Sequence, residues 1–458
     1  MSASPASLSS APAAVTAPAG LPRLLASVLP DRAMTLAEHT GLHGGLPALA
    51  QPRGRGGRAT ALIEELERSG LRGHGGAGFP TWMKLRAVAD ARRRALVVVN
   101  AVEAEPASLK DRTLTELLPQ LVLDGAILAA GAIGADEVIV CVSAAAPESV
   151  NSLRAAIAER EGAPGPEGAG SPPRLRLEQM PDHYVAGEES AVVSRLNDGP
   201  ARPTFRPPMP FERGVGRRPT LVNNAETLAH VALIARHGAG WFRELGPAGH
   251  PGSALVTLAG PVADPGVYEI AHGASLSSLI AAGGGTTEPL RAALIGGYAG
   301  SWIAAERLHA VALSDEHLAA HGASLGAGVV ALLSEQACPV AETARVARWM
   351  ADQSAGQCGP CVHGLGSLAT TLEELSGGVG RGGGALPRLE RLAGVVAGRG
   401  ACGHPDGAVN LIVSALRCFA SDFADHARHG RCERCLRESE LPLPVRRPQA
   451  STTWGPGR

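Results

Sequence analysis

Lysine is almost absent from this chain, although positive charge is not. Lys84 and Lys110 are the two lysines among 42 basic residues, so arginine carries nearly every positive charge. Arginine presents a wide planar fork and lysine a compact point charge, so a tight anionic site can distinguish them. We therefore expect Lys84 and Lys110 to serve a specific site, the alternative being two lysines left over at the surface.

Charge of one sign and long apolar runs are also lacking. The 42 basic residues balance 43 acidic ones, which argues against nucleic acid as a partner. No window reaches the roughly 18 uninterrupted apolar residues of a membrane-spanning helix, and even residues 121–142 are broken by charge. Residues 1–20 are rich in Ala, Pro and Ser. They make a poor signal peptide, and we expect them to form a disordered leader. These features predict a soluble, cytoplasmic chain without direct membrane insertion.

Cysteine is sparse, with eight residues in 458, which excludes the disulfide framework of a small secreted protein. Six of the eight lie between Cys358 and Cys435, as expected of thiolates kept reduced for metal binding. Cys141 lies in a strand-like run and Cys338 begins a helix, so both are expected to be packing residues. The length and the 45% hydrophobic content allow about three domains with real cores.

Glycine, by contrast, is abundant and is concentrated in GLRGHGGAGFPTWMKL, residues 70–85. Glycines remove side chains from a turn, so backbone N–H groups can approach a phosphate or a flat ring. The residues that follow predict a helix whose positive end faces this turn. A helical pattern rather than a strand precedes the loop, so it does not match the dinucleotide fingerprint G-x-G-x-x-G. The presence of Phe79 and Lys84 favours a ligand cradle over a merely flexible loop.

Polar residues follow a buried strand expected at residues 95–100. Glu103, Glu105 and Lys110 come just beyond its carboxyl end, where ligands bind in open α/β sheets. Two expected helix starts, YVAGEESA (184–191) and PTLVNNAETL (219–228), add further polar side chains. Each alone is as readily explained by turn and cap residues. Together they predict a polar pocket for sugar hydroxyls and ring carbonyls.

The second half of the chain changes character twice. Residues 254–285 are typical of a small β-rich domain, with short strands and Pro-Gly turns. From Cys338 onward the pattern is helical and contains DQSAGQCGPCVHG, in which Cys358 and Cys361 form a C-x-x-C. Three residues before Cys358, where a third thiolate would continue the spacing, the chain has Ala355.

These motifs, in this order, resemble one known family. They are similar to the flavin-carrying, NADH-oxidising subunit of respiratory complex I and its relatives in NAD-reducing hydrogenases and formate dehydrogenases. The resemblance rests on GLRGHGGAGFPTWMK, NAVEAEPASLKDR, YVAGEESA, FRPPMPF, PTLVNNAETL, GPVADPGVYE, SAGQCGPC and a distant Cys402. It covers roughly residues 55–425, and it is specific because separated motifs agree where any one would be weak.

The resemblance implies an α/β fold class with three domains. It implies a Rossmann-like FMN domain, a ubiquitin-like β-grasp middle domain of the soluble-ligand-binding type, and a C-terminal helical bundle with a [4Fe–4S] cluster. On this basis we expect a leader and short helix (1–45), an FMN- and NADH-binding domain (46–245), a β-grasp domain (246–335), a helical iron–sulfur domain (336–430) and a tail (431–458).

The resemblance also implies roles for individual residues. The flavin loop is matched by Gly73, Gly75, Gly76, Gly78 and Lys84, and the FMN-contacting segments by Asn100, Glu103, Tyr184, Gly187, Glu188, Glu189, Asn223, Asn224 and Thr227. The NADH-handling positions are matched by Phe79, Glu105 and Arg206. An acidic residue such as Glu105 can accept hydrogen bonds from ribose hydroxyls, and a lysine such as Lys84 can neutralise the FMN phosphate. No catalytic side chain is assigned, because hydride transfer needs no protein acid or base.

Departures from the family pattern are informative. Val102 replaces a carboxylate, Leu109 an aromatic residue and Arg206 a more usual lysine. Ala355 replaces one of the four cluster cysteines, which leaves Cys358, Cys361 and Cys402. A cubane needs four iron ligands, usually thiolates. Three options stay open: solvent or a small molecule at an open iron, loss of the cluster, or a fourth ligand from His363, His404, Cys418 or the pair Cys432 and Cys435.

The sequence therefore predicts an FMN-dependent NADH:acceptor oxidoreductase of the NADH dehydrogenase or diaphorase type. Hydride would pass from NADH to FMN, and single electrons would pass to an iron–sulfur cluster or to a protein redox partner, either ferredoxin-like or a membrane electron-transfer subunit. One alternative is a cluster-free, non-catalytic paralogue that binds a ligand or supports assembly. Another is the NAD-reducing diaphorase subunit of a hydrogenase or formate dehydrogenase. The residues do not distinguish NADH from NADPH or set the direction of electron flow.

Overall fold

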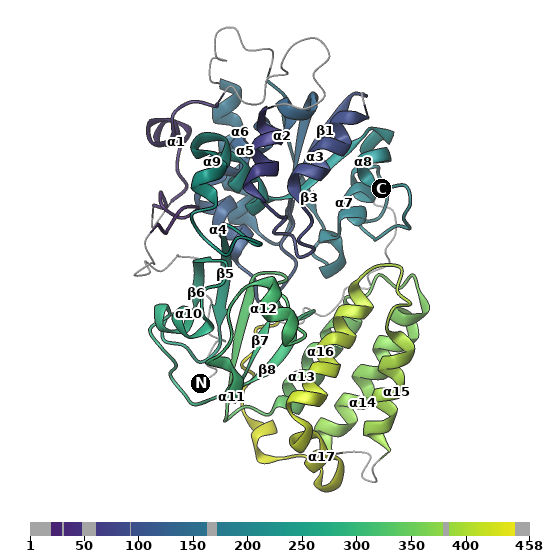
Figure 1. Cartoon of the computed structure of the whole chain (residues 1–458). Coiled ribbons are helices and arrows are strands. Elements are labelled where there is room, and N and C mark those ends of the chain that lie inside the picture. Colours follow the sequence, from purple (N-terminus) through teal and green to yellow (C-terminus); the bar gives the residue numbers. More distant parts are fainter. Residues whose placement is uncertain are drawn as a thin grey trace.

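A computed structural model describes residues 20–29, 32–47, 61–91, 93–162, 172–378 and 384–444 of the 458-residue chain. The leader expected before residue 20, and the last part of the expected tail, lie outside the described residues. Within the described part, an α/β region, a second sheet and a helical bundle follow one another along the chain (Figure 1).

Four parallel strands form the first sheet, in the order β3-β2-β1-β4. The valine-rich strand β1 lies inside this sheet, and its side chains alternate between two cores, with Val97 and Val99 facing one and Leu96 and Val98 the other. Both faces are therefore covered, as is usual for a parallel sheet. The strands are β1 (Ala95–Ala101), β2 (Ala135–Ser143), β3 (Arg174–Met180) and β4 (Thr220–Asn224).

Helices cover this sheet and include one very close crossing. A Cβ atom at Gly125 of α5 would lie 1.8 Å from the carbonyl oxygen of Leu228 in α9, so only glycine lets these helices pack. The helices are α1 (Leu36–His43), α2 (Ala61–Ser69), α3 (Thr81–Asp90), α4 (Lys110–Leu117), α5 (Pro119–Ile133), α6 (Pro147–Gly162), α7 (Glu189–Leu196), α8 (Pro210–Arg213) and α9 (Ala225–Phe242), with short 3-10 turns at Tyr184–Gly187 and Val215–Arg217.

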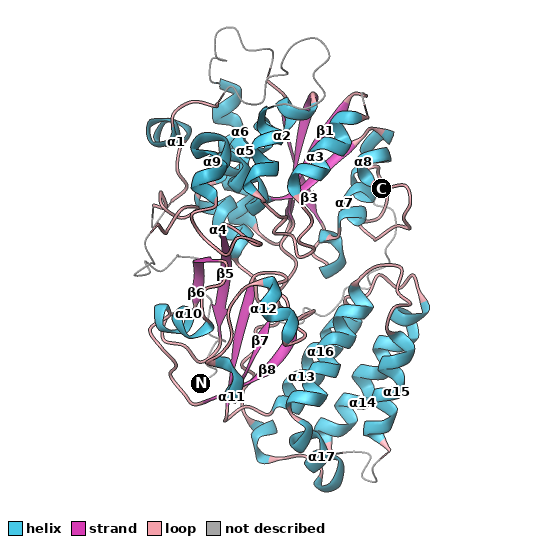
Figure 2. Cartoon of the chain, in the orientation of Figure 1, coloured by secondary structure: helices cyan, strands magenta, loops and turns pink. Residues whose placement is uncertain are grey.

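The middle region is a five-stranded mixed sheet in the order β6-β5-β9-β7-β8 (Figure 2). Strands β5 and β9 pair in parallel, and the remaining neighbours are antiparallel. Its strands are β5 (Ser253–Ala259), β6 (Gly266–Ala271), β7 (Leu290–Ile295), β8 (Ser301–Ala304) and β9 (Val329–Ser334), and its helices are α10 (Leu276–Ala282), α11 (Ala305–Leu308) and α12 (Asp315–Ala320).

The C-terminal region is a helical bundle packed against one face of the second sheet. Tyr298 and Trp302, from the middle region, share a core with the bundle helices. The elements are α13 (Pro339–Asp352), a π-helical turn (Pro360–Leu365), α14 (Gly366–Gly377), α15 (Ala385–Val396), α16 (His404–Cys418), α17 (Ala420–His429) and a 3-10 turn (Glu433–Leu436). The end of the bundle where α16 begins faces the α/β region, and α17 lies at the opposite end (Figure 1).

The fold class expected from the sequence is confirmed. A parallel α/β sheet, a small β-rich unit and a helical bundle occur in the expected order. Among the described residues no single helix is long and apolar enough to cross a membrane, although two sharply bent pairs, α4 with α5 and α16 with α17, pass that test by length and composition.

Candidate functional site

A cavity of about 530 Å³ opens where strands β1 and β4 end. This is the edge of a parallel sheet at which ligands bind in open α/β folds, and the volume lies in the usual range for small-molecule sites. The wall consists of Gly73, Gly75, Gly76, Ala77, Gly78, Phe79, Lys84, Asn100, Tyr184, Val185, Gly187, Glu188, Glu189, Arg206, Val222, Asn223, Asn224, Thr227, Ala299, Cys402, Gly403 and His404.

The glycine-rich loop forms one wall of this cavity and leads into α3. Its turn is anchored by two backbone interactions, from the His74 N–H to the Thr227 hydroxyl (2.9 Å) and from the Gly73 N–H to the Phe79 carbonyl (2.9 Å). Helix α3 has no side-chain cap at its start. The Thr81 and Met83 N–H groups donate to the carbonyl oxygens of Leu71 (3.0 Å) and Pro80 (3.2 Å), so the Trp82 N–H is the first-turn donor left for an anion beside the glycine turn.

Lys84 brings positive charge to the same wall. Its ammonium donates to Oε1 of Glu189 (3.1 Å) and to the carbonyl oxygen of Val222 (3.2 Å). An ammonium has three N–H donors, so one donor direction is left after these two bonds. The side chain is 29% exposed, which lets it meet both the protein and a ligand.

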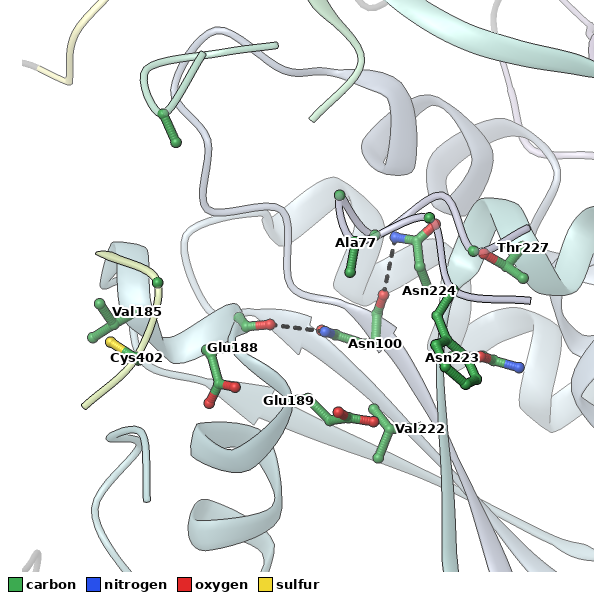
Figure 3. A pocket seen from close by; sticks show the side chains of 18 of the residues that line it. Ala77, Asn100, Val185, Glu188, Glu189, Val222, Asn223, Asn224, Thr227 and Cys402 are labelled. Carbon is green, nitrogen blue, oxygen red and sulfur yellow. Dashed lines mark hydrogen bonds between the residues drawn. The ribbon is translucent and has the colours of Figure 1, made fainter. Parts of the chain in front are cut away.

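Three asparagines lie at the ends of neighbouring strands and contribute to the cavity wall (Figure 3). Asn100 is the register partner of Asn224 across β1 and β4, and its amide donates to the Gly187 carbonyl (2.8 Å). Asn224 caps α9 by accepting from the Glu226 N–H (3.0 Å) and donates to Asp111 (2.6 Å). The amide nitrogen of Asn223 is buried without a hydrogen-bond partner. A buried, unpaired donor at a cavity wall indicates a ligand that accepts from it.

Another part of the wall carries two carboxylates at the start of α7. Glu188 caps this helix by accepting from the Ser190 N–H (2.8 Å) and the Ala191 N–H (3.1 Å). Arg206 pairs with Glu188 and lies 3.6 Å from Glu189. The guanidinium therefore offsets negative charge at the cavity mouth, where it would otherwise repel a phosphate.

Glu105 lies behind this cavity rather than on its wall. Its Oε2 accepts from the Tyr298 N–H (3.0 Å) and lies 3.5 Å from the Tyr184 hydroxyl, and its Oε1 is buried without a partner. Burial raises the pKa of this carboxyl to about 7. Glu105 therefore contacts Tyr184, which lines the cavity, while its predicted role toward NADH stays a prediction.

Glu103 is also buried beyond the wall, and it stabilises the start of α4. It accepts from the N–H groups of Asp111 (3.1 Å) and Arg112 (3.0 Å) and from the Ser108 hydroxyl (2.6 Å). These bonds give Glu103 a structural role. Its side chain is not among the residues that line the cavity.

Lys110 borders a second, smaller cavity of about 190 Å³ beside the glycine loop. The ammonium lies 2.9 Å from both Asp111 and Glu226, and 3.4 Å from Asn224. Burial acts to lower the pKa of Lys110, but the carboxylates of Asp111, Glu226 and Glu103 outweigh it and raise this pKa. Lys110 is thus locked in a buried ion cluster that holds Asn224 in place.

The structure brings together all the predicted cofactor-binding residues except Glu103 and Glu105. Wall residues missing from the prediction are the apolar Ala77, Val185, Val222 and Ala299, together with Gly403 and His404. Small apolar residues carry no chemical signal in a sequence, so only the three-dimensional arrangement finds them. For His404 the sequence suggests a role as an iron ligand only.

The three predicted iron ligands lie near one another at the end of the bundle that faces the cavity. Cys402 lines the cavity itself. Burial, followed by the neighbouring Cys358 and Cys402 thiols, raises the pKa of the Cys361 thiol to about 12. Thiols that raise one another's pKa through proximity are suited to share a cationic metal centre, which favours their thiolate forms. Ala355 is buried, only 6% exposed, and contributes no ligand atom.

The residues weighed as a fourth iron ligand differ in their surroundings. His404 donates from Nε2 to the Met350 carbonyl (2.8 Å), while its Nδ1 is buried without a partner. His363 is exposed on the π-helical turn, and Cys418 ends α16 at the far end of the bundle. Cys432 and Cys435 lie beside Cys338 instead. Cys338 is buried in the core that the bundle shares with the second sheet, as expected of a packing residue, and Cys432 and Cys435 pack against that core.

Three protein-family models match the chain. The Nuo51 FMN-binding domain matches residues 66–233, the SLBB domain residues 255–297, and the NADH-ubiquinone oxidoreductase-F iron-sulfur binding region residues 341–426. The first range contains the cavity residues contributed by the α/β region, and the third contains Cys358, Cys361 and Cys402.

Similar proteins extend over most of the chain. An NADH-quinone oxidoreductase F-type subunit of Rhizobium meliloti, the second of that name, is 33% identical over 379 residues, covering 81% of this chain and 90% of that protein. The NADH-quinone oxidoreductase F-type subunit of Streptomyces coelicolor is 32% identical over 90% of this chain and 93% of its own length. The NADP-reducing hydrogenase subunit HndC of Solidesulfovibrio fructosivorans is 31% identical over 81% of this chain and 77% of its own.

A solved structure is similar as well. The crystal structure of an NAD+-reducing [NiFe]-hydrogenase in the H2-reduced state contains a chain that superposes with a TM-score of 0.75 at 32% identity. The match covers 81% of the present chain, which spans 63% of the length of the hydrogenase chain.

Proposed function

Because this chain belongs to the family of NADH-quinone oxidoreductase F-type subunits, we propose that it is an FMN-dependent NADH:acceptor oxidoreductase whose electrons leave through an iron–sulfur cluster. The observation that carries the proposal is the convergence of separate motifs on one cavity. Residues from the glycine loop, the strand ends, α7 and the bundle share its wall, and Cys402 is among them. A flavin pocket and an electron exit thus adjoin each other.

The residues present fit FMN. The glycine loop, the uncapped start of α3 and the Lys84 ammonium offer donors to a phosphate. The buried amide of Asn223 offers a donor to a ring carbonyl. FMN, when bound, supplies the chemistry that the side chains lack, accepting a hydride and releasing single electrons. The protein holds the ring, orients NADH against it and excludes water.

We assign the NADH side of the cavity to its more exposed wall. Phe79 is 47% exposed and offers an aromatic face to a nicotinamide or adenine ring. Arg206, beside Glu188 and Glu189, offers a guanidinium to the pyrophosphate. Glu105 supports this side indirectly, since it contacts the Tyr184 hydroxyl from behind the wall.

The electron exit is assigned to Cys358, Cys361 and Cys402, with His404 as the fourth iron ligand. The Nε2–H of His404 donates to the Met350 carbonyl, which leaves the Nδ1 lone pair buried without a partner, and His404 lines the same cavity as Cys402. Histidine replaces cysteine as an iron ligand in other iron–sulfur proteins and raises the reduction potential. If the fourth iron instead carried a solvent molecule, His404 would not be its ligand.

The test is anaerobic purification followed by flavin and iron quantitation, with EPR spectra recorded after NADH reduction. We expect one FMN and about four irons per chain. Cys402→Ser should lose most of the iron, while Cys418→Ser, a change of the same kind at the far end of α16, should keep it. Protein with flavin but no iron would remove the cluster from the proposal, and protein with neither would indicate the non-catalytic alternative.

The NAD-reducing direction is a second candidate function. It is favoured by the likeness to the NAD+-reducing hydrogenase structure and to the HndC subunit. In either direction we propose that the chain works within a multi-subunit assembly, and that a ferredoxin-like or membrane electron-transfer subunit exchanges its electrons. Rates of NADH oxidation and of NAD+ reduction with a viologen dye, compared on one preparation, distinguish the two directions.

We also propose that the expected domain limits at residues 46–245 and 246–335 hold, and that the third domain begins at residue 336 but extends past residue 430. The first and second sheets and the bundle fall within these three domains. The described part of the expected tail, residues 431–444, packs against the bundle and the second sheet instead of leaving the fold, and it is best grouped with the iron–sulfur domain.

A further inference from the structure

Four potential metal ligands meet at the end of the bundle farthest from the flavin cavity. They are Cys338 at the start of α13, His426 on α17, and Cys432 and Cys435 in the segment after α17. Their ligand atoms all lie within 4.8 Å of one another. Nothing in the proposed FMN and iron–sulfur chemistry uses these four side chains.

The spacing of the ligand atoms matches a single tetrahedral ion. Sulfur atoms are 3.3 Å apart between Cys338 and Cys435 and 3.6 Å apart between Cys432 and Cys435. The Nε2 atom of His426 lies 3.5 Å from the Cys338 sulfur and 3.9 Å from the Cys435 sulfur. Zinc bonds of about 2.3 Å to sulfur and 2.0–2.1 Å to nitrogen imply tetrahedral edges of roughly 3.5–3.8 Å. An iron–sulfur cubane spreads its ligands over four separate irons.

The imidazole of His426 is held in the orientation that a metal ligand requires. Its Nδ1 lies 3.2 Å from the backbone carbonyl oxygen of Leu375. A carbonyl oxygen can only accept a hydrogen bond, so Nδ1 carries the proton and the Nε2 lone pair faces the sulfur atoms. Metal-binding histidines commonly use such a backbone bond to fix the tautomer and the ring plane.

The segment that carries Cys432 and Cys435 is fixed to the body of the protein. Arg434 donates to Asp422 of α17 (2.6 Å), and Asp422 also pairs with Arg291 of β7. Further along, Glu440 accepts from the Ser334 N–H of β9 (2.8 Å). The two thiols are therefore positioned against Cys338 by contacts that do not depend on the thiols themselves.

We propose that Cys338, His426, Cys432 and Cys435 form a structural zinc site that joins the end of the chain to the bundle. The site is separate from the iron–sulfur ligands. Cys338 caps the start of α13 and Ala355 follows its end, and a helix of 14 residues spans about 20 Å. Three thiolates and one imidazole complete a tetrahedral shell, so no position is left open for a substrate.

The test is zinc quantitation on the anaerobically purified full chain. We expect one zinc per chain in addition to iron. Cys435→Ser should lower zinc at least about tenfold while leaving FMN and iron unchanged. The matched control Cys418→Ser changes another partly buried cysteine outside both sites and should retain zinc, iron and FMN. Wild-type protein without zinc, or a Cys435→Ser protein that loses iron and keeps zinc, would overturn the proposal.

X-ray absorption at the zinc edge of the wild-type chain decides the case even if the variant does not fold. We expect three sulfur ligands at about 2.3 Å and one nitrogen ligand at about 2.0–2.1 Å. A shell of oxygen and nitrogen alone, or of four sulfurs, would contradict the ligand set. This measurement concerns zinc only. A result that contradicts the zinc site would therefore not affect the proposed function, which the FMN and iron measurements test separately.

Discussion

The ammonium nitrogen of Lys84 lies 3.1 Å from Oε1 of Glu189, which joins α3 to the first residue of α7 beside the flavin cavity. A second bond, to the Val222 carbonyl, reaches β4. The lysine on the cavity wall is thus held between three elements, with a donor left for a ligand anion. Arginine fits this place poorly, because its planar fork is wider and carries fixed donor directions.

Lys84→Ala is expected to weaken FMN binding by about 10- to 100-fold. The loss corresponds to one charge-assisted hydrogen bond of about 1.5–3 kcal/mol. Lys84→Arg should recover only part of the affinity, because charge alone does not restore the geometry. The measurement is a fluorescence titration of flavin-depleted protein with FMN. Unchanged affinity in Lys84→Ala would show that the phosphate binds elsewhere.

Arg86→Ala is the matched control for this series. Arg86 lies on the same helix, but it pairs with Glu67 and stacks on Trp82 away from the cavity. Its removal deletes one positive charge from α3 without touching the wall. FMN affinity in this variant should equal that of the wild type, which separates a local contact from a general effect of charge.

The stability of the protein should fall as pH rises toward 7 because of Glu105. Its folded-state pKa of about 7 lies above the roughly 4.3 of an unfolded glutamate. Between these values the folded chain binds more protons than the unfolded chain, so the free energy of unfolding decreases with pH. At about 1.4 kcal/mol per pKa unit the full effect is up to about 4 kcal/mol.

Glu105→Gln should remove this dependence while keeping an acceptor for the Tyr298 N–H. Melting temperatures should be measured from pH 4 to pH 8. The two proteins should have similar values at the acidic end, and the melting temperature of the variant should rise relative to that of the wild type as pH increases. Glu161→Gln, an exposed change on α6, should track the wild type throughout. Parallel curves for Glu105→Gln and wild type would contradict a raised pKa at Glu105.

Ala355→Cys should add a thiolate ligand to the iron–sulfur site. A fourth thiolate would displace the histidine or solvent ligand, lower the reduction potential and slow cluster loss in air several-fold. The measurements are iron retention over time and the EPR spectrum of the NADH-reduced protein. Ala351→Cys, at the last turn of α13, is the control and should change neither. An identical spectrum in Ala355→Cys would place residue 355 away from the cluster.

Much of the fold was predictable because local patterns and long-range packing agree. The valine run at residues 95–100 forms the buried strand it predicts, and the glycine loop ends where α3 begins. The ordered motifs identified the family before any geometry was known, and this identification is confirmed by relatives that span most of the chain. Most of the residues that line the cavity were predictable in the same way, since polar side chains after parallel strands gather at one sheet edge.

Other features depend on contacts that no spacing in the sequence reveals. Cys338 and Cys435 meet across 97 residues, and His426 joins them from a separate helix. Glu103 and Glu105 follow a strand end as ligand-binding residues do, yet backbone N–H groups hold both carboxylates behind the wall. A sequence pattern places such residues near a site, but the turn after the strand decides whether they face it.

The pairing of Asn100 with Asn224 has a consequence for how this protein can diverge. The two residues occupy one rung of adjacent parallel strands, although 124 positions separate them in the chain. Side chains alternate along a strand, so inserting or deleting one residue before either asparagine within its strand would turn that amide to the other face. Insertions and deletions that preserve the pocket are therefore confined to the connecting segments. The two strands can accept substitutions, but the number of residues in each must stay the same.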